Sequence, residues 1–350
     1  MPKRKGLLVV AALAMLAWVG EAGATLSVFN TFTGNELVST DGCGSNTASC
    51  TLQSNIQAGS TIQAAYLYSS TFQSTTDPNG ITLGKGANST APTFTPLGAN
   101  NVSLQAWRAD VTSFVQANAN IGSLTTWLVT EGANTSNLDG EALVIVYSNA
   151  TAQPNTHTIS ILDGFSATTG DTAKILFTPL PVGFTAHMFL GDGFSFDGVL
   201  PLSPTSATQV STITVNGTNL TTVAGHCDDS QDANCANGSL FTMGGSNAGS
   251  KTDPFTPFPS PLVGDDHEAY DLGNVFKVGD TSGTLNTLNP SNDDNIFLQV
   301  FDISGTAAIN APLPPTGPAP APVPEPGTLL LLGAGLTGLA GVRQALKRRI

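Results

Sequence analysis

Three carboxylate side chains fall close together in a turn-rich stretch and could do acid–base chemistry. Glu131, Asp139 and Glu141 all lie in the segment EGANTSNLDGE. Glycoside hydrolysis needs one carboxylic acid and one carboxylate, which acts as a base or nucleophile, on either side of the bond. These residue types are equally ordinary in turns, and closeness in sequence does not fix the distance between carboxyl groups. The segment is therefore a candidate hydrolase site that competes with a plain structural interpretation.

Oxygen-rich clusters elsewhere contain the hard ligands that Ca²⁺ prefers. One cluster alternates like the start of an EF-hand loop, with Asp228, Ser230, Asp232 and Asn234. Ala233 replaces the required glycine and Ser239 stands where the bidentate Glu should be, so the EF-hand interpretation fails. Weaker calcium candidates are Asp265, Asp266, Glu268 and Asp271, followed later by Asp293 and Asp294. Acidic runs usually just face water, so we predict no cofactor and keep calcium as an open alternative.

The four cysteines form two close pairs within loop-like stretches, Cys43 with Cys50 and Cys227 with Cys235. Four cysteines permit three connectivities. Short loops close at low entropic cost, and an oxidising compartment lets the bonds persist, so we expect two local disulfides. A C-x-x-C pair is absent from the sequence, so zinc–thiolate or redox chemistry is not indicated.

Other chemistry finds little support in the sequence. The four histidines are scattered, and neither G-x-S-x-G nor H-E-x-x-H occurs. The 25 acidic residues outnumber the 12 basic ones, and seven of those basic residues lie in the two ends of the chain. So acidic a body repels phosphate backbones, which excludes nucleic-acid binding through a basic patch.

The amino terminus has the layout of a secretory signal peptide. Lys3 to Lys5 form a positive region, Gly6 to Val19 form an apolar region, and Ala22 and Ala24 supply the small residues that signal peptidase needs. The apolar region is short for a membrane span. We therefore expect export and cleavage after Ala24.

The carboxyl terminus combines a spacer, an apolar helix and a basic tail. Residues 304–322 are rich in Pro and Ala, so they are expected to run extended rather than bury a core. Thr328 to Val342 is an apolar helix candidate, followed by Arg343, Lys347, Arg348 and Arg349. The basic cluster should stay on the cytoplasmic side, so the tail is expected to anchor the chain transiently in the inner membrane.

Val323, Pro324, Glu325 and Pro326 precede this helix, and the three parts in this order resemble the PEP-CTERM sorting signal of Gram-negative bacteria. In that family an exosortase, an integral-membrane protease-transpeptidase, recognises the Pro-Glu-Pro element. The resemblance implies cleavage near Pro324 to Pro326 and delivery of the body to the cell surface or the extracellular polysaccharide matrix. The partners that this resemblance implies are exosortase and exopolysaccharide, in addition to the signal peptidase expected from the amino terminus.

A competing sorting signal lies upstream, where Leu313 to Gly317 reads LPPTG and matches the pentapeptide of Gram-positive sortase substrates. Ten residues separate Gly317 from the apolar helix, whereas the Pro-Glu-Pro element lies directly beside it. A chance match is unsurprising in a Pro-rich spacer. The exosortase interpretation is therefore preferred.

The body that these signals flank reads as an all-β fold. Short apolar runs bounded by turn residues predict nine strands, which require two sheets. They are Thr61 to Tyr68, Val102 to Trp107, Ser123 to Thr130, Ala142 to Tyr147, His157 to Leu162, Ala173 to Phe177, His187 to Leu190, Ser211 to Val215 and Ile296 to Ile303. Ala109 to Val115 is predicted as a short helix with Asp110 as its N-cap. We expect a β-sandwich, in a jelly-roll-like form, over residues 25–303.

The predicted organisation is a signal peptide (1–24), a β-sandwich body (25–303), a stalk (304–322) and a sorting signal (323–350). Ala109 to Thr112, the strand ending at Tyr147 and Asp163 to Phe165 are loosely similar to uncharacterised bacterial surface β-domains. We expect a non-enzymatic structural or adhesive surface protein. The alternatives are a polysaccharide hydrolase and a carbohydrate-binding module in which Trp107 and Trp127 stack on sugars.

Overall fold

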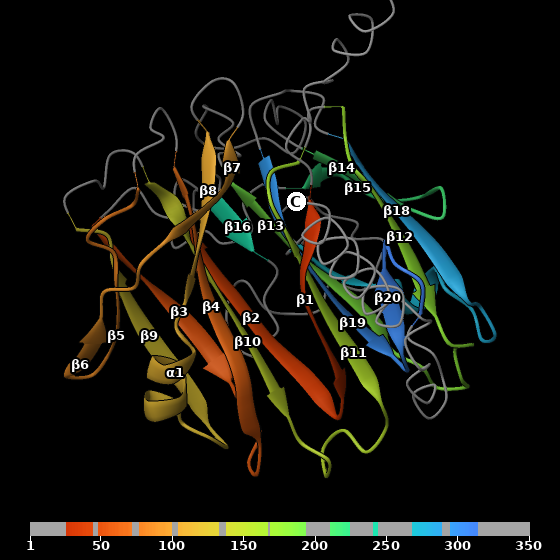
Figure 1. The fold of residues 1–350 in the computed structure, drawn as a ribbon, viewed down its shortest axis with the longest axis horizontal. Coiled ribbons are helices and arrows are strands. Elements are labelled where there is room, and N and C mark those ends of the chain that lie inside the picture. Colours follow the sequence, from red (N-terminus) through yellow and green to blue (C-terminus); the bar gives the residue numbers. More distant parts are fainter. Residues whose placement is uncertain are drawn as a thin grey trace, which may run out of the picture. The chain divides into compact units, whose positions relative to one another are not determined.

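The computed structural model describes residues 26–44, 48–71, 77–99, 104–132, 138–166, 169–193, 211–224, 241–243, 268–288 and 295–313. In these ranges the chain is mostly β, with antiparallel strands in four sheets (Figure 1). They also contain one α-helix, α1 (Thr112–Asn118), and a short 3-10 helix, Leu272–Asn274. The predicted all-β class is confirmed, but the expectation of two sheets is wrong.

We number the sheets I to IV. Sheet I contains β3 (Ser49–Asn55), β9 (Leu124–Thr130), β5 (Thr82–Lys85) and β6 (Asn88–Thr90), in that order. Sheet II contains β2 (Glu36–Gly44), β10 (Leu138–Ser148), β4 (Thr61–Thr71), β8 (Gln105–Asp110) and β7 (Thr95–Ala99).

Sheet III contains β1 (Ser27–Gly34), β11 (His157–Asp163), β19 (Asn295–Ser304), β13 (Ala186–Gly193) and β16 (Phe241–Met243), and β17 (Ala269–Asp271) also pairs with β13. Sheet IV contains β15 (Thr218–Ala224), β14 (Ser211–Val215), β18 (Ser282–Leu288), β12 (Thr172–Phe177) and β20 (Ala307–Ile309).

Three apolar cores join the four sheets in the order I, II, III, IV. The first core includes Trp127 of sheet I and Leu143 of sheet II. The second includes Val144 of sheet II and Val300 of sheet III, and the third includes residues of sheets III and IV. Sheets II and III are therefore internal and bury both faces.

Strand β10 shows why the internal sheets read as continuous apolar runs. Leu143, Ile145 and Tyr147 belong to the first core. Their neighbours Ala142, Val144 and Val146 belong to the second core. Successive side chains of a strand point to opposite faces, so a strand between two cores must be apolar at every position. β10 lies between β2 and β4, as expected for a central strand.

Each of the nine predicted strands overlaps an observed strand, although the one predicted from Val102 to Trp107 is observed as β8, Gln105–Asp110. The predicted helix is displaced. Helix α1 begins at Thr112 and not at Ala109, because Ala109 and Asp110 continue β8 and pair with Leu67 and Tyr66 of β4. Asp110 keeps a local role, since its Oδ1 accepts a hydrogen bond from the Thr112 N–H at 2.8 Å.

The folded unit extends beyond the predicted end of the body at residue 303. Strand β20 lies in the segment assigned to the stalk and pairs with β12 through Ile309 and its two predecessors. Ala307 and Ile309 are buried in the third core, and this burial outweighs the spacer-like composition. Residues up to Leu313 form one compact unit.

The predicted export and sorting elements lie outside the described residues. They are the signal peptidase site at Ala22 and Ala24, the Val323 to Pro326 element and the apolar helix candidate. Within the described ranges, no helix combines the length and the apolar character needed to cross a membrane.

Candidate functional site

The three carboxyl groups of the candidate hydrolase site come together at one end of sheets I and II. Glu131 directly follows β9, while Asp139 and Glu141 lie near the start of β10. Glu141 pairs with Cys43 of β2, and the disulfide joins Cys43 to Cys50 of β3. These pairings bring the end of β9 beside the start of β10, because β3 pairs with β9.

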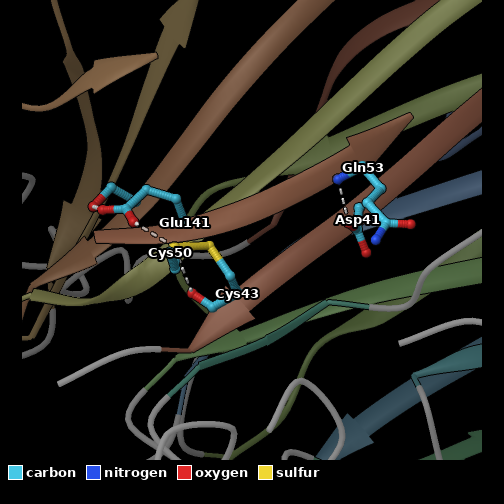
Figure 2. Close-up of a disulfide and its surroundings, with 6 residues drawn as sticks. Asp41, Cys43, Cys50, Gln53 and Glu141 are labelled. Carbon is cyan, nitrogen blue, oxygen red and sulfur yellow. Dashed lines mark hydrogen bonds between the residues drawn. A yellow bond between two sulfur atoms is a disulfide. The ribbon is translucent and has the colours of Figure 1, made fainter. Parts of the chain in front are cut away.

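The predicted Cys43–Cys50 disulfide is present, with its Cα atoms 6.1 Å apart. Figure 2 shows the Glu141 carboxyl group beside it, with Oε2 3.7 Å from Cys50 Sγ. Farther along the same strands, Asp41 accepts a hydrogen bond from the Gln53 N–H (Figure 2). The disulfide and this hydrogen bond both tie β2 of sheet II to β3 of sheet I. The predicted Cys227–Cys235 disulfide lies outside the described residues.

A β-bulge separates the directions of the two carboxyl groups on β10. The pairing of β10 with β4 shifts between Leu138 and Gly140, so Asp139 is the extra residue. Asp139 Oδ2 accepts a hydrogen bond from Ser70 Oγ at 3.1 Å, and Glu141 Oε1 accepts one from Ser69 Oγ at 3.3 Å. The two serines are successive residues of β4, so the carboxyl groups lie at opposite faces of sheet II.

The cluster is buried and incompletely hydrogen-bonded. Glu131, Asp139 and Glu141 each have 0% exposed surface. Both carboxyl oxygens of Glu131 and Oδ1 of Asp139 have no hydrogen-bond partner within the described part of the chain. The ion pairs found there involve Asp163 and Asp302 instead. No positive side chain among the described residues therefore balances this cluster by an ion pair.

Burial makes the charged forms of these carboxyl groups unfavourable. It raises the pKa of Glu131 to about 8. Burial also raises the pKa of Asp139 and of Glu141 well above their usual range, and the nearby carboxyl groups raise both further. Near neutral pH burial therefore favours the protonated forms of these carboxyl groups.

In the described residues, Cys43, Cys50 and Glu141 are three side chains of metal-ligating type whose donor atoms lie within 4.8 Å of one another. The two sulfur atoms are bonded to each other, so they are not thiolate ligands. The three carboxyl groups are not gathered so tightly.

Of the weaker calcium candidates, Glu268 and Asp271 lie in the described residues. Glu268 is fully buried rather than solvated, and its Oε2 accepts a hydrogen bond from the Tyr270 hydroxyl at 2.7 Å. Asp271 Oδ1 accepts the Gly273 N–H and caps the 3-10 helix. The expectation of a solvated acidic loop is therefore wrong at Glu268. Asp265, Asp266, Asp293, Asp294 and the EF-hand-like cluster lie outside the described residues.

The two tryptophans proposed to stack on sugars are core residues. Trp107 Nε1 donates to Thr71 Oγ1 at 3.1 Å, and Trp127 Nε1 donates to Ser54 Oγ at 2.9 Å. Both side chains are buried. A sugar cannot reach either indole ring, so the stacking hypothesis is wrong for these two residues.

Sequence reasoning missed a Ser–His–Asp arrangement in sheet III. His157 Nδ1 lies 2.7 Å from Asp302 Oδ1, and Ser304 Oγ lies 3.1 Å from His157 Nε2. These contacts follow the order of a catalytic triad, although Ser304 Oγ also accepts the Thr185 N–H at 2.8 Å. The three side chains are buried, and we interpret them as a tie between β11 and β19. The only sequence signal for this arrangement was that Asp302 and Ser304 stand two positions apart on one strand, which places their side chains on the same face.

A second missed feature is an open pocket of about 570 Å³ between sheets II and III, beside α1. Asn30 Nδ2 donates to the Tyr66 hydroxyl at 3.2 Å at this pocket. Its walls are aromatic and polar: Asn30, Phe32, Gln63, Ala64, Tyr66, Thr90, Asp110, Val111, Thr112, Ser113 and Phe114.

Comparisons with solved structures do not identify an activity. BpGH86A, a β-porphyranase of glycoside hydrolase family 86 from the human gut bacterium Bacteroides plebeius, aligns with 8% identity and a TM-score of 0.22. The alignment covers 77% of this chain and 36% of that one, so this chain spans only a minor part of that enzyme. So weak a likeness carries no argument about this protein. No curated protein matches the chain.

The family comparison, in contrast, identifies the carboxyl terminus. Residues 322–348 match the PEP-CTERM protein-sorting motif, and this range contains Val323 to Pro326, the apolar segment and most of the basic tail. Such a motif implies sorting by an exosortase. The chain therefore carries a PEP-CTERM protein-sorting motif, which implies an exported protein associated with the cell surface.

Proposed function

We propose that this protein is a structural or adhesive component of the cell surface or extracellular matrix, released from the inner membrane by exosortase, with no enzymatic activity of its own. The sorting motif at residues 322–348 is the observation that carries this proposal. It supports delivery of the body to the outside of the cell, after an inner-membrane intermediate.

The described body suits passive display. Four sheets share three apolar cores, and a disulfide ties sheet I to sheet II. The carboxyl groups that resembled a hydrolase pair are fully buried, so a polysaccharide chain does not reach them in this conformation. These features favour a durable scaffold over a hydrolase.

The proposal is tested by following processing in the native host. Mass spectrometry of the mature protein should find Thr25 at its start and an end near Pro324 to Pro326. The double variant Pro324→Ala/Pro326→Ala should accumulate as full-length protein in the membrane fraction. The matched control Thr316→Ala disrupts the LPPTG element and should be processed normally.

Two results would overturn this proposal. One is full-length protein persisting in wild-type cells, and the other is processing that depends on Thr316 but not on the proline pair. Hydrolysis of a polysaccharide by the purified protein, abolished by Glu141→Gln, would overturn the non-enzymatic role.

The pocket beside α1 favours a second candidate function, carbohydrate binding. Aromatic faces such as those of Phe32 and Phe114 stack on sugar rings, while Asn30, Gln63 and Asp110 offer hydrogen bonds to hydroxyl groups. The net charge of −13 disfavours an anionic glycan, so a neutral polysaccharide is the expected ligand.

Binding to a panel of neutral and anionic polysaccharides tests this second function. Phe32→Ala and Gln63→Ala should each weaken binding of the neutral glycan, whereas Leu128→Ala, an exposed residue of sheet I, should not. Equal binding by all three variants, with unchanged melting temperatures, would exclude the pocket as the binding site.

A further inference from the structure

We propose that Glu141 carries the proton for the Cys43–Cys50 disulfide, taking it from the Cys50 thiol when the bond forms and returning it when the bond is reduced. The observation that carries this proposal is the contact between Glu141 Oε2 and Cys50 Sγ at 3.7 Å (Figure 2). The inference goes beyond the proposed role in display, because it concerns how the protein acquires the covalent tie between sheets I and II.

The hydrogen atom in this contact belongs to the carboxyl group. A sulfur atom in a disulfide carries no hydrogen, so Cys50 Sγ can only accept. The other carboxyl oxygen of Glu141, Oε1, accepts a hydrogen bond from Ser69 Oγ at 3.3 Å. Ser69 therefore leaves Oε2 as the oxygen that carries the proton and directs it toward Cys50.

The sulfur atom beside the carboxyl group is also the more accessible of the two. Cys50 is 6% exposed, whereas Cys43 and Glu141 are 0% exposed. A small disulfide such as oxidised glutathione therefore meets Cys50 first. Thiol–disulfide exchange begins with attack by a thiolate, so the Cys50 thiol must first lose its proton, and Glu141 is in place to accept it.

The exchange balances with Glu141 as the proton acceptor. The Glu141 carboxylate takes the Cys50 proton, and the Cys50 thiolate attacks one sulfur of oxidised glutathione while the other leaves as a thiolate. Cys43, after losing its proton to solvent, attacks Cys50 and displaces the second glutathione thiolate. Two electrons pass from the cysteines to glutathione, and Glu141 ends protonated, as its contact with the finished disulfide requires.

The surroundings of Glu141 make it a suitable base for a thiol. An ordinary glutamate, with a pKa of about 4.3, is a poor base for a thiol with a pKa of about 8.5. Burial raises the pKa of Glu141 well above its usual range, and Glu131 and Asp139 raise it further, while the Ser69 hydrogen bond lowers it. The ion pairs in the described part of the chain do not involve Glu141.

Reoxidation of the reduced protein by oxidised glutathione tests the proposal, with acid quenching and mass spectrometry to follow the bond. A Cys227→Ser/Cys235→Ser parent leaves one cysteine pair to react. Glu141→Gln should form the bond roughly 10-fold or more slowly near neutral pH, because the thiol then loses its proton only to solvent. Its rate should also begin to rise at a higher pH than that of the parent, because a neutral amide cannot share the loss of a proton.

Asp139→Asn is the matched control. Asp139 lies on the same strand, is equally buried and accepts a hydrogen bond from Ser70, but its carboxyl group lies at the opposite face of sheet II. This variant should reoxidise at nearly the parent rate. Ser69→Ala keeps the Glu141 carboxyl group but frees Oε1, so its rate should lie between those of the parent and Glu141→Gln.

Two further measurements separate proton transfer from a loss of structure. Circular dichroism of each reduced variant shows whether it is folded, and Ser69→Ala decides the question if Glu141→Gln is not. In concentrated guanidinium chloride all variants should react at the same rate, because unfolding separates Glu141 from Cys50. The proposal is overturned if folded Glu141→Gln reoxidises as fast as the parent, if Asp139→Asn slows the reaction equally, or if the difference persists in guanidinium chloride.

Discussion

The side chains of Trp127 and Leu128 point to opposite faces of β9 and meet opposite environments. Trp127 is 0% exposed, and Leu128 is 50% exposed. Trp127→Ala should lower the free energy of unfolding by about 3–5 kcal/mol, because it leaves a cavity in the first core and removes the hydrogen-bond donor to Ser54. Leu128→Ala should change it by less than about 0.5 kcal/mol. Urea unfolding measures both, and similar losses in the two variants would contradict the assignment of faces.

Arg108 ties sheet II to sheet III in a different way. Its guanidinium forms an ion pair with Asp163 of β11 and lies 3.3 Å from the ring centroid of Phe29 on β1. The Tyr68 hydroxyl donates to the same Asp163 carboxylate at 3.1 Å. Burial raises the pKa of Asp163, while Arg108 and Tyr68 lower it. Arg108 thus offsets the cost of burying a carboxylate between two sheets.

Arg108→Ala should therefore destabilise the protein by about 2–4 kcal/mol, because it leaves Asp163 buried without its cation. The double variant Arg108→Ala/Asp163→Ala should lose less than the two single variants lose together. Denaturant unfolding of the three variants gives the interaction energy. Strictly additive losses would show that the ion pair does not couple the sheets.

At the scale of elements, two glycines with similar φ angles separate the cost of a left-handed backbone from the cost of a steric clash. Gly170 precedes β12 with φ +86°, and Gly183 precedes β13 with φ +75°. A Cβ atom at Gly170 would lie 1.8 Å from the Thr287 carbonyl oxygen, whereas one at Gly183 would meet nothing within 4 Å.

Gly183→Ala should therefore cost about 1–2 kcal/mol, the price of the left-handed conformation alone. Gly170→Ala adds a backbone clash with β18, and its total cost should reach about 2–5 kcal/mol. Thermal and urea unfolding of the two variants measure the difference. Equal losses would mean that β18 moves aside without cost.

Nine of the strands could be predicted from the sequence, because each of these nine is a short apolar run between turn residues. The number of sheets could not, because local pattern does not show what covers each face. The continuous apolar run of Ala142 to Tyr147 did indicate burial on both sides. The other strands were missed, among them β1, β2, β3 and β18 as well as the short β20. In β20 a few apolar residues in a Pro- and Ala-rich segment form no local pattern, and only pairing with β12 reveals them.

For a similar reason, the sequence could identify the residues of the candidate site but not their burial. Glu131, Asp139 and Glu141 could be singled out because they are acidic and close in sequence. Their burial follows from the pairing of β10 with β2 and β4 and from the disulfide to β3, which no local pattern contains. The His157–Asp302 pair is a stronger case, because 145 residues separate its two members.

At the scale of the whole molecule, the layered sheets bury titratable groups fully or in part. His187 of β13 is one such group. Burial lowers its pKa, while Asp302 and Asp271 act to raise it and His157 acts to lower it further. The net direction is downward, so the fold favours neutral His187.

The pH dependence of global stability should carry this signature. The unfolded chain takes up a proton near the ordinary histidine pKa of about 6.5, while the folded chain takes it up only at lower pH. The stability that neutral His187 contributes is therefore complete above about pH 6.5, and it is lost as the pH falls through the lower folded value. In His187→Gln that loss disappears, so its Tm should decline less than the wild-type Tm between pH 7.5 and 5. Melting curves across this range measure the difference. Because every other titrating group is common to both proteins, parallel declines would show that the partial burial of His187 does not govern its protonation.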